Sequence, residues 1–384
     1  MSDVEPVPEA IAVTRAQALN YRVAVHQLER PADDPLCEGV LLAGVMDNPP
    51  GRTASTALRV RGAVVDPERV ALVQSLRAAP HLHRAEDLAC LAAALRLDEA
   101  GDLAKDHFGL FGQDLSDQRI GFAAAVDQVA EAMRAVTADG RGRAKGELST
   151  ALNELVDARL RPWCPGCAVQ HVHDALFRYA TLQAGLCISV RATGPFHYLP
   201  RPTAGSRPDP QFDPQRGRRE LVRRFLRLCG PSRPEQLAKW LALTPAAARR
   251  LWHPLGDELR AVTVEGRHGW MHQEDLDELR AAPAATEVRL LPPYDPLTEL
   301  ADRELLLPDR ARRGAVWRAA ANPGVLVVRG EIAGTWRQRA TARRLTITIQ
   351  SFHALTAAAR RAASQQAEAR GDPAGPAVET QFTP

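Results

Sequence analysis

The amino-acid sequence contains no apolar run that approaches the ~18 residues needed for a membrane-spanning helix. Its first residues, MSDVEPVPEAIAV, are acidic and lack the pattern of a signal peptide. We therefore expect a cytoplasmic protein without a membrane partner, whose six cysteines are reduced. Four of these cysteines stand alone in apolar patterns and are interpreted as small core residues: Cys37, Cys90, Cys187 and Cys229.

Lysine is scarce, because only three of the 49 basic residues are lysines. The net charge of +3 excludes a polycation that binds nucleic acids through bulk charge. Since a bias toward arginine with abundant alanine and proline is typical of a GC-rich genome, the positions of the arginines are more informative than their number.

Basic residues cluster beside expected helix starts and strand ends, where DNA phosphates would be contacted. The clusters comprise Arg141, Arg143 and Lys145; Arg216, Arg218, Arg219, Arg223 and Arg224; and Arg337, Arg339, Arg343 and Arg344. The alternative is that each cluster is a solvated face paired with some of the 46 acidic residues.

Residues 219–271 have the pattern of a helix-turn-helix followed by a wing. Apolar residues recur at helical spacing up to the Gly230-Pro231 pair, which ends the first helix. Ser232, with Glu235 three residues later, predicts the cap of a second helix. Thr244-Pro245 predicts the start of a third, because threonine is a good N-cap and proline fits the first helical position.

The third helix is the expected recognition helix. Its exposed face carries Arg249 and Arg250, in the place where such a helix meets DNA. Short strands at 261–264 and 269–271, joined by a turn at 265–267, form the predicted wing. A winged helix is foremost a module that docks on a nucleic-acid duplex, so we expect duplex DNA as the partner.

The same plan recurs upstream. Residues 121–199 predict helices, a basic glycine-containing turn, a strand and a hairpin in the same order, and a looser copy begins at Thr14. From residue 287 the apolar period changes to two, which predicts an antiparallel meander followed by an amphipathic helix. We therefore expect an α+β, mainly helical fold with three tandem winged-helix units and a C-terminal β-rich, barrel-like domain. The predicted boundaries are a disordered tail at 1–13, winged helices at 14–118, 119–204 and 205–282, the β-rich domain with its terminal helix at 283–370, and a disordered tail at 371–384.

The segment from Trp163 to His173 has the spacing of a metal site. Cys164 and Cys167 form a CxxC pair, and His171 follows at a distance that lets all three ligands close on one zinc ion. His171 and His173 would point to different sides of a helix, so one of them at most joins the thiolates, and a fourth ligand is not identified. Two alternatives remain, a thioredoxin-like redox pair and buried thiols.

Two boxes carry a resemblance to a known family: LLPPYDPLTELADRELLLPD at 290–309 and VLVVRGEIAGTWR at 325–337. Together with the order of the helical units, they resemble the bacterial winged-helix DNA glycosylases of the AlkZ type, which unhook alkylated purines and interstrand crosslinks. The resemblance extends from about Thr14 to Arg370. It implies a concave basic channel for duplex DNA, built by three winged helices and a small β-barrel. It also implies a monomer whose catalysis needs no cofactor, so that any zinc would be structural.

In that family the chemistry is assigned to a motif of glutamine, an apolar residue, and glutamine or aspartate near the start of the first unit. Here the motif falls on Val45 to Asn48 and departs from the pattern, because either register lacks the first glutamine and Met46 takes its place in one of them. Asp47 and Asn48 are the candidate catalytic residues. Asp47 would stabilise the sugar cation and Asn48 would orient water. The alternative is that both residues only form the turn before a helix at Thr53.

Other groups have weaker indications. His81 and His83 either face DNA or are structural. A pair such as Asp302-Arg303 or Asp309-Arg310 is expected to join the C-terminal domain to the third unit. The candidate DNA-binding residues are Arg143, Lys145, Arg219, Arg223, Arg249, Arg250, Arg337 and Arg339. We predict a divergent DNA glycosylase for alkylated or crosslinked purines, with enzyme status left open by the altered motif. The alternative is a non-catalytic DNA-binding protein, either a regulator or a lesion-shielding self-resistance factor.

Overall fold

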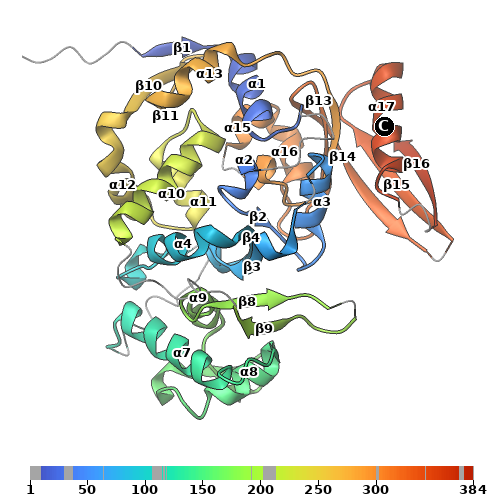
Figure 1. Cartoon of the computed structure of the whole chain (residues 1–384). Coiled ribbons are helices and arrows are strands. Elements are labelled where there is room, and N and C mark those ends of the chain that lie inside the picture. The colour runs from blue at the N-terminus through green and yellow to red at the C-terminus, as the bar shows by residue number, and fades with distance from the viewer. Residues whose placement is uncertain are drawn as a thin grey trace, which may run out of the picture.

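The computed structural model describes residues 10–29, 38–63, 65–105, 115, 117, 119–191, 193–201, 213–299, 302–341, 343–371 and 376–383. Cys37 and the first nine residues of the predicted N-terminal tail lie outside these ranges. The fold is a mixed α+β arrangement of many short helices and several small sheets (Figure 1). In the described part of the chain, no helix combines the length and the apolar character that a membrane crossing requires.

The helices and hairpin predicted at 219–271 are all present. They are α10 (Pro214–Cys229), α11 (Pro234–Leu241), α12 (Pro245–Trp252), β10 (Leu259–Val264) and β11 (Arg267–His272). Thr244 caps α12 as expected, because its side chain accepts from the backbone N–H of Ala247 at 3.3 Å. The predicted cap of α11 is wrong by one residue. Arg233 is the N-cap, and its backbone N–H donates to Gln236, whose side chain also accepts from the Ser232 hydroxyl.

The N-terminal part contains a small sheet of order β2-β4-β3. Its elements are α1 (Arg15–Val25), α2 (Glu38–Leu41), β2 (Val45–Met46), α3 (Thr53–Val60), β3 (Val70–Gln74), β4 (Pro80–Arg84) and α4 (Leu88–Ala94). A strand before them, β1 (Ile11–Val13), pairs in parallel with β10. Part of the segment predicted as an N-terminal tail is therefore ordered, because its apolar Ile11 and Val13 extend the β10-β11 sheet.

The middle part has its own apolar core and lies at the bottom of Figure 1. It consists of α7 (Phe122–Val136), β5 (Arg143–Ala144), α8 (Lys145–Leu152), β6 (Trp163–Cys164), β7 (Val169–Gln170), α9 (Asp174–Gln183), β8 (Leu186–Ser189) and β9 (His197–Pro200). Residues from the predicted first and third units instead share one core, in which Leu19 and Phe225 are both buried.

The C-terminal part is a five-stranded sheet of order β12-β13-β14-β15-β16. Its strands are β12 (Val288–Leu291), β13 (Gly324–Val328), β14 (Glu331–Ala340), β15 (Arg344–Ser351) and β16 (Ala377–Thr383). The helices of this part are α13 (Leu276–Ala281), α14 (Pro296–Glu299), α15 (Arg303–Leu306), α16 (Arg310–Val316) and α17 (Ala357–Glu368).

Two expectations are corrected here. The barrel-like domain is an open sheet, because β12 and β16 are its edges and do not pair with each other among the described strands. The segment predicted as a disordered C-terminal tail contains β16, which pairs in parallel with β15. Val378 and Phe382 pack against the core that the sheet forms with α17, so even this polar segment has an apolar side to bury.

Two ion pairs, one buried and one partly buried, link the N-terminal part to the box at 290–309. Arg61 and Asp295 form a two-pronged pair at 2.8 and 2.9 Å, and both side chains are fully buried. Buried Arg22 pairs with Asp302 at 2.8 Å. The expected local pair is therefore wrong: the acid of Asp302-Arg303 binds an arginine 280 residues away. Asp309 contacts Arg312 in place of Arg310.

Candidate functional site

The candidate catalytic segment lies at the end of β2. The Asp47 carboxylate is buried, with 4% of the residue exposed. One of its oxygens accepts from the backbone N–H of Gly51 at 2.5 Å. The other accepts from the N–H groups of Arg52, Thr53 and Ala54 at 2.9, 2.8 and 3.1 Å. This arrangement satisfies the free donors at the start of α3, as the turn alternative requires.

Asn48 differs from Asp47 in being exposed. Its backbone N–H donates to the Thr53 hydroxyl at 2.9 Å, which fixes the turn and leaves the carboxamide at the surface. The structure therefore places the two candidate residues in different environments. Asp47 is a buried acceptor with both oxygens engaged, while Asn48 is within reach of solvent.

β2 pairs with β4 and thereby brings the motif beside the two histidines. Met46 lies opposite His81, and the backbone N–H of Asp47 donates to Pro80 at 2.9 Å. Both His81 and His83 are buried. The sequence pattern gave no reason to expect that these residues, more than thirty positions apart in the chain, are neighbours.

Burial lowers the pKa of both imidazoles and so favours their neutral forms. Burial, and then the charge of Arg224, lower the pKa of His83 to about 4 against the opposing effect of Asp87. Burial, Arg77 and His83 lower the pKa of His81. The His83 Nε2 atom lies 2.8 Å from the Ser75 hydroxyl. The imidazoles are thus structural groups of the small sheet, although they lie next to the motif.

Gly44 allows this close packing. Its φ is +81°, and a Cβ atom added there would lie 2.2 Å from His83 Cε1. A side chain at Gly44 would therefore displace the imidazole of His83 as well as strain the backbone. The residue before the motif and the buried histidine consequently form one packed unit.

The candidate DNA-binding arginines are mostly exposed and mostly paired with acids. Arg249 and Arg250 are each 61% exposed on α12, where they pair with Glu235 and Asp102. The remaining pairs are Arg219 with Glu258, Arg223 with Glu258 and Glu274, Arg143 with Asp139, and Lys145 with Asp174. Arg337 donates to the carbonyl of Ala321 at 2.9 Å, and Arg339 lies exposed on the same strand.

These basic residues lie on separate elements. Arg143 is on β5 and Lys145 begins α8, while Arg249 and Arg250 are on α12 and Arg337 is on β14. The helices α8 and α12 and the strand β14 lie far apart in Figure 1. Exposed ion pairs contribute only ~0–1 kcal/mol, so a phosphate can replace the carboxylate partner at little cost. The ion pairs between these basic residues and acids agree with the alternative that each cluster is a solvated face. They do not prevent the same residues from binding phosphate.

A basic pocket was missed by the sequence patterns. A cavity of about 330 Å³ between α3, the C-terminal sheet and the end of α17 is lined by Arg59, Arg289 and Arg370, together with Gln338 and Gln366. Among the described residues, no acidic side chain lines it. Burial, and then the charge of Arg59, lower the pKa of Arg370 to about 10. No local spacing could have revealed this site, since its arginines come from three distant segments.

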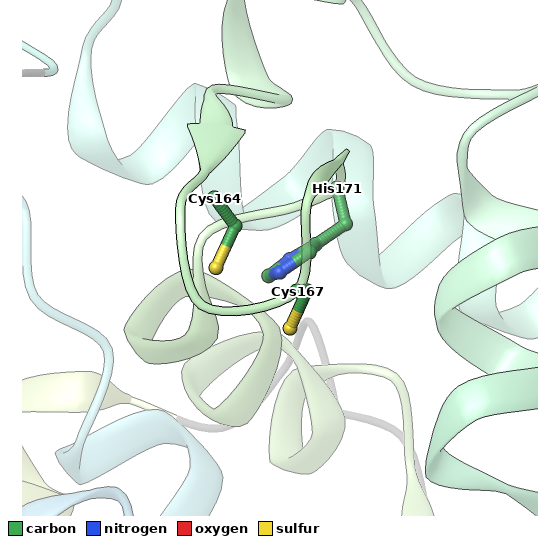
Figure 2. Close-up of side chains that lie close together, drawn as sticks. All are labelled: Cys164, Cys167 and His171. Carbon is green, nitrogen blue, oxygen red and sulfur yellow. The ribbon is translucent and has the colours of Figure 1, made fainter.

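The predicted metal ligands do come together. Cys164, Cys167 and His171 each offer a ligand atom, and these atoms all lie within 4.8 Å of one another. Figure 2 shows the two thiol side chains and the imidazole gathered around one point at the turn of the β6–β7 ribbon. Hydrogen bonding from the backbone of Cys167 lowers the pKa of the Cys164 thiol to about 7. The group can therefore supply a thiolate near neutral pH.

Comparisons with known proteins agree with the fold and with the sequence boxes. The family model described as DNA glycosylase AlkZ-like matches residues 45–372. The interstrand DNA cross-link repair glycosylase of Streptomyces sahachiroi is 32% identical over 133 residues, which are 32% of this chain and 35% of the relative. This match thus spans about a third of that relative's length.

Among solved structures, the Streptomyces sahachiroi DNA glycosylase AlkZ superposes with a TM-score of 0.73 and 21% sequence identity. The superposition covers 97% of this chain and 100% of the solved chain, so the whole fold is shared. Because the family model includes the motif at β2, the box at 290–309 and most of the C-terminal sheet, this chain belongs to the AlkZ-like DNA glycosylase family.

Proposed function

We propose that this protein binds duplex DNA and hydrolyses the N-glycosidic bond of alkylated or crosslinked purines. The observation that carries the proposal is the family match over residues 45–372. The similarity to a relative named as an interstrand cross-link repair glycosylase supports the proposed substrate class. Three winged-helix units would provide the DNA-binding surface. Of these units, the α10–α12 and β10–β11 segment has the clearest order of elements.

The proposed reaction needs little covalent help from the protein. An alkyl group on a purine ring nitrogen makes the base a cationic leaving group, so the bond to C1′ breaks through an oxocarbenium-like state. A water molecule then forms the new bond to C1′ and loses its proton. The protein must stabilise the sugar cation and position the water, and no cofactor is required.

We propose that Asp47 and Asn48 share these two tasks. Asp47 would act from its buried position as a fixed negative charge, because backbone N–H groups just before and at the start of α3 hold both of its oxygens. Asn48 would orient the water, since its side chain is exposed. Met46 at the family's glutamine position predicts a slower reaction than the intact motif would give.

A second function is favoured by the same segment. Backbone N–H groups occupy both oxygens of the Asp47 carboxylate, and Met46 stands in place of the glutamine. Both features are also expected in a DNA-binding relative that has no catalytic activity. Such a protein would be a regulator or would shield a lesion. Either role requires tight DNA binding without release of the base.

One experiment separates the two functions. Duplexes carrying N7-alkylguanine, N3-alkyladenine or an interstrand crosslink are incubated with the wild type, Asn48→Ala and Met46→Gln, and the released base is measured. A glycosylase predicts release by the wild type, more by Met46→Gln and less by Asn48→Ala. Tight binding of the same duplexes without release by the wild type or by Met46→Gln would assign the chain to the non-catalytic function.

DNA binding itself is tested by its salt dependence. Each phosphate contact contributes about −0.9 to the slope of log K against log salt concentration. Arg249→Glu combined with Arg250→Glu should reduce the affinity and make the slope shallower. Arg280→Glu serves as the matched charge reversal, because Arg280 is exposed on α13, outside the candidate clusters. Equal losses in both variants, or no binding at low salt, contradict the proposed surface.

A further inference from the structure

The segment that carries the three metal-ligating side chains has almost no other source of order. It is a ribbon of two-residue strands, β6 and β7, joined by the turn 165–168. Trp163 and Val169 are 61% and 50% exposed, so their apolar groups do not anchor it. Two paired residues on each strand are far below what a hairpin needs for independent stability in water. A cross-link at this ribbon would supply the missing stabilisation.

The imidazole of His171 is prepared as a ligand. Its Nδ1 atom lies 2.7 Å from the carbonyl oxygen of Val172. Because a carbonyl oxygen can only accept, Nδ1 carries the proton and donates a hydrogen bond to that oxygen. The Nε2 atom then has a free lone pair. It is buried and has no hydrogen-bond partner among the described residues. A buried, unpaired nitrogen costs about 1–3 kcal/mol, and a backbone carbonyl that fixes the tautomer is typical of metal-bound histidine.

The spacing of the ligand atoms fits a small tetrahedral ion. Zn–S bonds of about 2.3 Å and a Zn–N bond of about 2.1 Å place tetrahedral ligand atoms about 3.5–3.8 Å apart. The three ligand atoms already lie within 4.8 Å of one another, so small side-chain rotations would complete the site. Two thiols and one imidazole form a soft donor set, which favours zinc over magnesium or calcium.

We propose that Cys164, Cys167 and His171 bind one zinc ion and that this ion holds the β6–β7 ribbon in place. Among the described residues, these three form the whole ligand group, so water completes the fourth position. The next candidates along the chain are not in the group. His173 Nδ1 accepts from the backbone N–H of Ala175 at 3.2 Å, and the Asp174 carboxylate pairs with Lys145 and Arg178. The ribbon also contacts the helical layer, since Asn153 donates to Gln170 at 2.9 Å. Loss of the ion would therefore loosen the ribbon while leaving the core of α7 and α9 intact.

The test measures metal on the full chain. Freshly purified, unchelated wild type should contain about one zinc per chain, while Cys164→Ser and His171→Ala should contain none. The matched control is Cys90→Ser, which alters a half-buried thiol elsewhere and should keep its zinc. A metal-free wild type should bind Co²⁺ with the absorption of a thiolate complex, and this measurement does not depend on the folding of any variant.

Chelation provides a second readout. Removal of zinc should make the peptide bonds around 163–171 more sensitive to protease, and added zinc should restore protection. Wild type that contains no zinc and gives no thiolate–Co²⁺ absorption would overturn the proposal. So would a thiol count under denaturing conditions that reveals a Cys164–Cys167 disulfide in the freshly purified protein. None of these results depends on whether the protein cleaves DNA bases.

Discussion

The buried pair of Arg61 and Asp295 gives the sharpest stability prediction. Asp295→Asn removes the carboxylate and leaves a guanidinium with no exposure to solvent. The remaining acceptors of Arg61 include the backbone carbonyls of His26 and Ala57, at 2.7 and 2.8 Å, but these carry no full charge. Breaking a buried pair from one side costs about 3–5 kcal/mol. Because folded domains are stable by only about 5–15 kcal/mol, this single change should remove a large share of the stability.

The assay is urea unfolding followed by circular dichroism. Asp295→Asn should lower the midpoint with an unchanged slope. The double variant Arg61→Met with Asp295→Leu should recover most of the loss, because apolar groups of similar size can replace a buried pair at little net cost. Asp277→Asn is the control, since Asp277 forms an exposed pair with Arg280 at 3.5 Å and should cost less than ~1 kcal/mol. A loss of unfolding free energy below ~1 kcal/mol for Asp295→Asn would refute this prediction. So would a double variant whose loss equals the sum of the losses in its two single variants.

Three further predictions concern acid stability, the motif and the basic pocket. His83 has a folded pKa of about 4 and an ordinary value of 6.5, so its contribution to stability is complete above pH 6.5 and is lost as the pH falls toward 4. The loss in unfolding free energy is about 3 kcal/mol. His83→Gln should therefore make the unfolding free energy less dependent on pH between 6.5 and 4, and an unchanged pH dependence would contradict this prediction. Asp47→Asn should lower the free energy of unfolding by about 1–3 kcal/mol, and with it the melting temperature, because it loses the oxygen that accepts from Gly51, while Asp66→Asn at an exposed cap should not. Unchanged stability would contradict this structural role, and base release retained by Asp47→Asn would contradict the catalytic role proposed for the same carboxylate. Arg59→Gln, which removes one arginine from the lining of the basic pocket, should weaken DNA binding and reduce the salt slope by about 0.9. An affinity equal to that of the wild type at all salt concentrations would show that the pocket is not part of the DNA-binding surface.

Features coded by neighbouring residues could be predicted from the sequence. The end of α10 follows from Gly230-Pro231, and the start of α12 follows from the capping threonine and the proline after it. The predicted metal ligands span only eight residues, so their spacing indicated that Cys164, Cys167 and His171 lie close together. The family resemblance rested on two boxes, and the family match supports it.

Long-range partners could not be predicted. Nothing near Asp302 indicates that its partner is Arg22, because a buried charge selects its counter-ion by three-dimensional proximity. Met46 and His81 are neighbours because β2 pairs with β4. These strands have two and five residues, which is too short for alternating apolar and polar residues to predict the pairing. β16 was missed because its sequence, AVETQFT, is largely polar and follows a segment rich in proline and glycine.

The two outer strands have a practical consequence for handling the protein. β1 covers one side of β10, and β16 covers one side of β15. A fragment trimmed to residues 14–370, the limits that composition suggests, would lack β1 and β16. The edges of β10 and β15 would then expose two rows of unpaired N–H and C=O groups. Such rows recruit strands from other molecules. The trimmed fragment should therefore form soluble aggregates or precipitate at concentrations where the full chain stays dispersed, and affinity tags fused directly to Ile11 or Thr383 would disturb the same edges.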